Sequence, residues 1–153
     1  MVDETQTVAT NRRAHRNYDI TETYEAGIVL RGSEVKSLRE AKVTLADAFG
    51  RIEGNELYLV GLHIGAYSSA SDLGNHELER KRKLLLHRRE IDKIKVKADH
   101  EQQSIVPLRL YFKNGRAKIE IGIGRGRKTY DKRQVIAERD ADMEARRAMS
   151  RRR

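Results

Sequence analysis

The chain has 153 residues, with 32 Lys and Arg against 23 Asp and Glu, so its formal net charge is +9 at neutral pH. The length fits a single domain, and the absence of cysteine excludes a disulfide framework, thiol catalysis and any cysteine-ligated metal site. No apolar run is long enough to span a membrane, and the first residues lack the features of a signal peptide. We therefore expect a soluble, cytoplasmic protein that binds a polyanion and not a membrane.

The basic residues are concentrated in two segments. Residues 80–97 hold 9 basic and 2 acidic side chains, and residues 125–153 hold 11 basic and 5 acidic ones, whereas residues 1–79 hold 8 basic and 13 acidic ones. Clustering favours directed contact with phosphate groups, because counterions are displaced where cations lie side by side. For residues 80–97 we favour binding over a merely solvated face, and for residues 125–153 binding and disorder are compatible.

The first part of the chain predicts a flexible end, a strand and a short helix. Residues 1–10 are polar and lack periodicity, so we expect them to be flexible. Residues 18–30 have the β-prone composition of a strand. Ser33 is a natural N-cap, and the apolar spacing after it predicts a short helix.

The middle of the chain predicts further strands and a second helix. Residues 43–67 contain short strand patterns, and residues 68–79 have the composition of a loop. The three leucines at 84–86 indicate either a short buried strand or the entry of a helix. His87 and Glu90 form a capping pair that predicts a helix after them.

A β-hairpin is the clearest local prediction. Apolar residues alternate with other residues over 104–124, on both sides of Asn114 and Gly115. Asn-Gly between two alternating runs is typical of a type I′ turn.

These elements predict a mainly β fold of antiparallel strands with two or three flanking helices, which is an α+β domain or a small barrel. We divide the chain into a flexible N-terminus (1–10), a folded RNA-binding domain (11–124) and a basic tail (125–153). The tail has too little apolar material for a core, so we expect it to be disordered alone and to become ordered, as a helix, on a partner.

The motifs of common enzymes are absent from the sequence, which contains no Walker-type loop, dinucleotide-binding glycine pattern, zinc-protease motif or nucleophile elbow. The five histidines show no metal-ligand spacing. Glu25 and Glu34 could meet across a bend, but nothing distinguishes them from other acidic residues. We therefore expect a binding protein without catalytic residues, metal or cofactor.

Three places combine basic residues with groups that could contact RNA bases. Basic, amide and aromatic side chains alternate at Asn11, Arg12, Arg13 and Tyr18. The alternative for them is a basic arm that enters the first strand. An outward leucine at 84–86, between Lys83 and His87, could pack on a base or ribose, or both faces could be covered. Tyr130 could stack on a base or belong to a flexible tail.

Several blocks, in this order, resemble the SmpB family of SsrA-binding proteins over roughly residues 11–147. The most specific blocks are Glu-Val-Lys-Ser-Leu-Arg at 34–39, Lys-Leu-Leu-Leu-His at 83–87 and Tyr-Asp-Lys-Arg at 130–133. The resemblance implies a closed, oligonucleotide-binding (OB)-like β-barrel with flanking helices and an unstructured C-terminal tail. It also implies binding to the tRNA-like domain of tmRNA and delivery of that RNA to stalled ribosomes for trans-translation, by mimicry of a tRNA anticodon arm.

The resemblance also assigns roles to residues. The tmRNA-binding positions that it carries over are Asn11, Tyr18, Glu25, Leu85, His87 and Lys118. The block at 131–133 matches a tail segment that acts at the ribosomal decoding centre, and the rest of the tail would turn helical in the mRNA channel. The tail residues that we assign to this function, with small-subunit rRNA as partner, are Arg127, Lys128, Tyr130, Asp131, Lys132 and Arg133. With tmRNA we expect a monomer.

The sequence departs from the family pattern at several positions. Arg16 stands where the family usually has a histidine, which leaves the stacking role of that position open, although arginine can also stack. Val96 and Gln103 replace glycines, so the helix before the hairpin could be longer. The alternative function is a general single-stranded RNA-binding or ribosome-associated OB-fold protein, and a nucleic-acid-processing enzyme is a weaker third.

Overall fold

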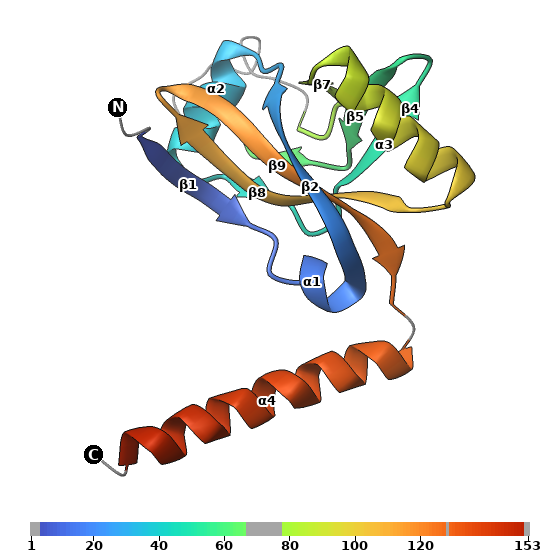
Figure 1. Cartoon of the computed structure of the whole chain (residues 1–153). Helices are drawn as coiled ribbons and strands as arrows, with labels where there is room; N and C mark the ends of the chain where they lie inside the picture. Colours follow the sequence, from blue (N-terminus) through green and yellow to red (C-terminus); the bar gives the residue numbers. More distant parts are fainter. Residues whose placement is uncertain (1–3, 67–77, 128, 152–153) are drawn as a thin grey trace.

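An antiparallel sheet of seven strands forms the centre of the computed structural model, which describes residues 4–66, 78–127 and 129–151 (Figure 1). The strands follow the order β1-β8-β4-β5-β7-β2-β9, and β8 also pairs with β9. Their bounds are Thr5–Thr10 (β1), Tyr18–Ile28 (β2), Phe49–Glu53 (β4), Glu56–Val60 (β5), Arg82–Leu85 (β7), Ser104–Lys113 (β8) and Arg116–Gly126 (β9). A small second sheet pairs β3 (Val43–Thr44) with β6 (His63–Ile64). The expectation of a mainly β protein is confirmed.

Helices connect and flank these strands. The described ranges contain α1 (Ala14–Asn17), α2 (Gly32–Arg39), α3 (Arg88–His100) and α4 (Thr129–Arg151). In Figure 1, α2 and α3 lie against the body that contains the sheet. Helix α4 follows β9, approaches α1 and extends away from the sheet. Among the described residues, no helix is both long and apolar enough to cross a membrane.

The main hydrophobic core lies on one side of the sheet, as the hairpin shows, and a smaller cluster of Ala14, Val106 and Leu108 lies on the other side. On β8 and β9, Leu110, Ile119 and Ile121 are fully buried, and the residues between them face the opposite side. Asn114 and Gly115 have φ values of 51° and 81°, the two positive values that a type I′ turn requires. The predicted hairpin is therefore confirmed.

Both predicted helices begin with a capping box. Helix α2 follows Arg31, whose backbone N–H donates to Oε1 of Glu34 at 2.8 Å, and α3 follows His87, whose backbone N–H donates to Oε1 of Glu90 at 3.2 Å. The N-cap of α2 is thus Arg31 and not Ser33, because Glu34 is then the third helical residue and its carboxylate can reach back.

The start of the chain differs from its prediction. Residues Thr5–Thr10 are not a flexible end but form β1, antiparallel to β8. Val8 and Ala9 pack against the core, and backbone pairing with β8 holds the rest of the strand in place. A short polar sequence shows neither the packing nor the pairing partner. The next segment, for which a basic arm was the alternative interpretation, contains α1, and Ala14 is buried there beside Val106 and Leu108.

Most of the C-terminal tail is the helix α4, but Arg125 and Gly126, predicted as the start of the tail, belong to β9 and pair with β2. Its side chains at 136–149 are exposed, and its Ala, Glu and Arg content favours a helix. Disorder of this segment in the absence of a partner stays a prediction.

Candidate nucleic-acid interface

Four strands place a row of residues side by side on the outward face of the sheet. Gly27 on β2 pairs with Leu85 on β7 and with Lys118 on β9, and Lys118 pairs in turn with Tyr111 on β8. Directly paired residues of antiparallel strands point to the same face. Leu85 and Lys118, which lie 33 positions apart in the sequence, therefore flank a residue that has no side chain.

Leu85 is the apolar part of this row. Its exposed fraction is 53%, whereas Leu84 beside it is fully buried and Leu86 is half-buried. A Cβ atom at Gly27 would lie 3.4 Å from Cβ of Leu85, so the leucine covers the space that the glycine leaves. Leu84 and Leu85 thus belong to a strand and not to the entry of a helix. Leu85 points outward, as the RNA-contact interpretation of the three leucines predicts.

Glu25 lies one pleat away from Gly27 on β2, and each of its carboxylate oxygens has a partner on β8. Oε2 accepts a hydrogen bond from the hydroxyl of Tyr111, and Oε1 lies 3.3 Å from Nζ of Lys113. The hydrogen bond from Tyr111 is the largest influence and lowers the pKa of Glu25; burial opposes it, while Lys113 and Lys118 reinforce it. Glu25 is therefore an anion at neutral pH, linked across β9 to β8.

Tyr111, Lys113 and Arg109 also lie on this face, although they are not among the site residues predicted from the sequence. The guanidinium carbon of Arg109 lies 4.4 Å from the centroid of the Tyr111 ring. Arg109 and Lys113 are half-buried, and Tyr111 between them is buried. The three residues occupy every second position of β8, so the alternation that predicted the strand also places them on one face.

Lys83 and His87 lie on either side of Leu85. Lys83 points to the same side of β7 as Leu85, and its Nζ lies 3.7 Å from the carboxylate of Glu56. His87 is exposed at the N-cap of α3. The structure thus brings Lys83, Leu85 and His87 together with Lys118 and Glu25 around β7, β2 and β9.

The other predicted RNA-binding residues lie at the far end of β2. Tyr18 is seven residues from Glu25, which is about 23 Å along a strand. Tyr18 packs against the cluster around Ala14, while Nδ2 of Asn11 donates to the Pro107 carbonyl at 2.9 Å. Arg12 and Arg13, between them, are exposed in a turn. The predicted residues therefore form two separate groups.

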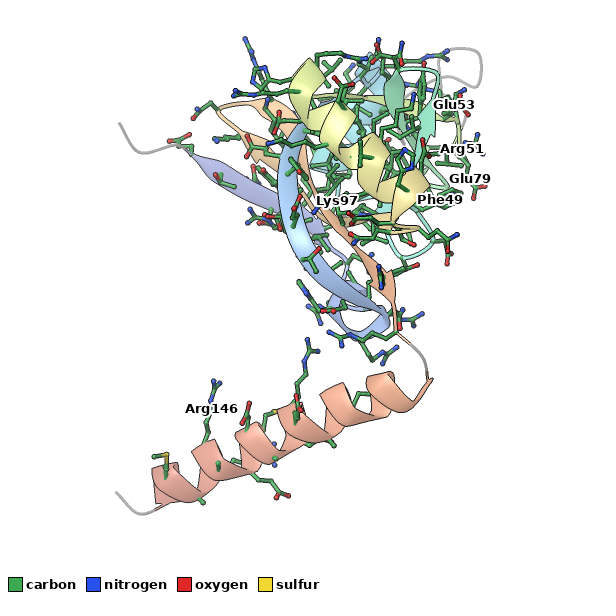
Figure 2. The ribbon with its side chains drawn as sticks, turned by 45° about the vertical axis from the view of Figure 1, so that its right-hand side comes forward. Phe49, Arg51, Glu53, Glu79, Lys97 and Arg146 are labelled. Carbon is green, nitrogen blue, oxygen red and sulfur yellow. The ribbon has the colours of Figure 1, made fainter. Side chains whose placement is uncertain are left out.

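Much of the basic segment 80–97 is engaged within the protein. Arg82 has no exposed surface, because its side chain points inward from β7 and pairs with the buried carboxylate of Glu34. Three further cations of the segment form ion pairs, namely Lys81 with Glu53, Arg88 with Glu56 and Lys97 with Glu22. Figure 2 labels Glu53 and Lys97, which belong to two of these pairs. The expectation that this whole segment faces RNA is therefore wrong for Arg82. Glu34 is also not a partner of Glu25, since Glu25 faces outward.

The tail begins with a residue that contacts the body. The backbone N–H of Arg127 donates to the Asn17 carbonyl at 2.7 Å, and its Nε donates to the His15 carbonyl at 3.2 Å. Its guanidinium also lies 3.7 Å from Asp19. Lys128 lies outside the described residues; the side chains of Tyr130, Asp131, Lys132 and Arg133 do too, although their backbone belongs to α4.

Within the described ranges, no group of three or more His, Asp or Glu side chains could hold a metal ion.

The outward faces of β7, β2, β9 and β8 offer an exposed leucine, several cations and one anchored carboxylate, a combination of groups suited to nucleic acid.

Comparisons with known proteins point to one family. The family model described as "SmpB protein" matches residues 8–151. An SsrA-binding protein of Frankia casuarinae is 53% identical over 145 residues, which cover 95% of this chain and 91% of that protein. One of Thermobifida fusca is 51% identical over 148 residues, covering 97% and 92%. A solved structure described as "tmRNA-SmpB: a journey to the center of the bacterial ribosome" is 44% identical, with a TM-score of 0.68, and covers 84% of this chain and 93% of that one.

Proposed function

The chain belongs to the SmpB family, and on that premise we propose that it binds tmRNA and acts with it on the ribosome in trans-translation. The observation that carries the proposal is the row Leu85, Gly27, Lys118 and Tyr111, with Glu25 beside it. The protein binds the tRNA-like domain of the RNA as a monomer and delivers it to stalled ribosomes in the cytoplasm.

The chemistry of this row supports a folded RNA as the ligand. An exposed leucine can pack on a ribose or a base, and the lysines can contact phosphate groups. A row that spans four strands on the outward face matches an RNA backbone or loop better than it matches a small molecule, which needs a concave site.

The strand pairings support the closed, OB-like barrel that the family resemblance implies. Starting from β8, the pairings pass through β4, β5, β7, β2 and β9, and β9 pairs with β8 again. A sheet whose pairings return to the first strand leaves no edge within that circuit. The barrel would then present the proposed RNA face on its outside.

The tail has a separate function in this proposal. Residues from Arg127 to Arg133 act at the decoding centre, and the rest of α4 occupies the mRNA channel against small-subunit rRNA, while the body stands in for a tRNA anticodon arm. The excess of basic residues after 124 and the length of α4 support this division. The protein positions RNA, and the proposal requires no covalent chemistry.

A binding comparison tests the proposal. The full chain should bind tmRNA more tightly than a tRNA or a random RNA of equal length at moderate salt, because a specific surface adds to the general attraction between cations and phosphate groups. Equal affinities would contradict the proposal and favour a general RNA-binding protein. Metal-dependent cleavage of any of these RNAs would instead indicate a processing enzyme.

A further inference from the structure

Tyr111 connects Glu25 with Arg109 on the proposed RNA face, and this connection bears on how Glu25 acts. We propose that Arg109, carried on the ring of Tyr111, contacts the bound RNA, and that Glu25 holds this pair in position. The inference rests on the proposed function, since it names further residues of the same face. Glu25 would then be a positioning residue, which acts through its neighbours on β8.

Glu25 is the unexpected member of a face that would meet phosphate groups. Its negative charge by itself opposes the approach of RNA. Both carboxylate oxygens, however, already accept hydrogen bonds from Tyr111 and Lys113. The contacts of Glu25 therefore support a role in fixing these two side chains.

Tyr111 is well placed to transmit that effect. Only 3% of the residue is exposed, although it belongs to the outward face of β8. Burial and the hydrogen bond to Glu25 raise the pKa of Tyr111, so its hydroxyl keeps the proton and remains the donor. With the hydroxyl held by β2, the ring has a defined position across β9, and it can serve as a platform.

Arg109 uses that platform. Its guanidinium stacks on the ring at 4.4 Å from the centroid, and the residue is only half-buried. A stacked guanidinium is restricted in its motion but keeps N–H donors and a free face for a phosphate or a base. Arg109 lies two residues from Tyr111, about 7 Å along β8. It pairs with Glu120 of β9, which pairs with Glu25 of β2, so Arg109 belongs to the next row of the same face.

The first experiment measures Arg109 directly. The probe is an RNA fragment that contains the tRNA-like domain of tmRNA, and its Kd for the full chain is determined over a range of salt concentrations. Arg109→Ala should weaken binding roughly five- to tenfold and reduce the salt slope by about one, as the loss of one phosphate contact does. Arg109→Lys should restore the slope but only part of the affinity, because lysine keeps the charge and loses the planar stack. An unchanged Kd and slope in Arg109→Ala would overturn the inference.

The second experiment is a double-mutant cycle. Glu25→Ala and Tyr111→Phe should each weaken binding to a similar extent, and the double variant should be no weaker than either, because each change removes the hydrogen bond between the two side chains. Losses that add would mean that Glu25 contacts the RNA independently and would contradict a positioning role. Thermal unfolding of each variant identifies any loss that comes from misfolding, in which case the Arg109 variants decide the question.

Glu120→Ala is the matched control. Glu120 lies directly across from Glu25 in the pairing of β2 with β9, and directly across from Arg109 in the pairing of β9 with β8. This change therefore removes the same charge from the same face, while the hydrogen bond from Tyr111 to Glu25 stays. Binding should stay equal or become tighter, and a loss as large as that of Glu25→Ala would contradict the inference. If the wild-type chain binds the fragment no better than a scrambled RNA of equal length, the proposed function itself fails; if the wild type is specific and Arg109→Ala is unchanged, only this inference fails.

Discussion

Glu34 and Arg82 form an ion pair with no exposed surface, which joins the first turn of α2 to β7. Nε of Arg82 donates to Oε2 of Glu34 at 2.6 Å, and its Nη1 donates to the Leu62 carbonyl at 2.6 Å. Successive residues of a strand point to opposite faces. Because Arg82 and Leu84 point inward, Lys83 and Leu85 both point outward. The pair thus determines which side chains of the basic segment face outward.

Removal of the carboxylate should destabilise the protein strongly. Glu34→Gln should lower the free energy of unfolding by about 3–5 kcal/mol, because the charge of Arg82 stays buried without the carboxylate that neutralises it. Urea unfolding measures the change. As a control, Glu40→Gln removes a surface partner of Lys42 and should cost less than about 1 kcal/mol. Equal costs for the two variants would contradict this account.

The same pair predicts a dependence of stability on pH. Burial alone raises the pKa of Glu34, but hydrogen bonds from the Arg31 backbone, Arg80 and Arg82 outweigh it, so the pKa lies below its ordinary value of 4.5. A carboxyl group with a lowered folded-state pKa contributes stability above the unfolded-state pKa, and that contribution is lost as the pH falls through the folded-state value. The wild type should therefore lose more stability than Glu34→Gln when the pH is lowered from about 6 to about 3. Equal losses in urea unfolding across that range would speak against a charged Glu34.

Neighbouring leucines on β7 separate binding from stability. Leu85→Ala should weaken RNA binding with little change in stability, because Leu85 is mostly exposed. Leu84→Ala should instead cost about 2–5 kcal/mol of stability, since Leu84 is fully buried. Binding titrations and urea unfolding of both variants measure these effects. The assignment of Leu85 to the RNA face is wrong if its loss leaves the Kd unchanged.

The end of β9 defines where the tail can be removed. A chain that ends at Arg127 keeps the contacts of that residue with Asn17 and His15, so it should retain tmRNA binding and fail to support tagging on stalled ribosomes. A chain that ends at Gly124 also loses the last pairings of β9 with β2 and should melt at a lower temperature. RNA binding and a tagging assay on the two truncated chains check this. Loss of RNA binding in the longer chain would show that the body and the tail do not act separately.

Local sequence patterns predicted most of the helices and strands, but not those that depend on contacts with distant parts of the chain. The hairpin at 104–124 followed from alternation and from Asn114-Gly115, and α3 followed from His87 and Glu90, because these signals act over a few residues. The segment Thr5–Thr10 was missed since its partner is β8, about a hundred residues away. Val96 belongs to α3, which continues to His100, as the absence of a glycine there indicated.

By itself, the sequence determined the family, the excess of basic charge and the RNA-binding residues that the family resemblance carries over, because motif order and composition need no three-dimensional information. Arg109 and Tyr111 joined these residues only through the structure. Only the tertiary structure decided which of those residues lie together. Strand pairing places Leu85, Lys118 and Glu25 on one face and leaves Tyr18 and Asn11 at the other end of β2. It also buries Arg82 inside a basic segment, because Glu34 of α2 supplies the opposite charge there. Such pairs depend on side chains that the fold brings together from distant positions, so net charge alone does not show which cations remain available to a partner.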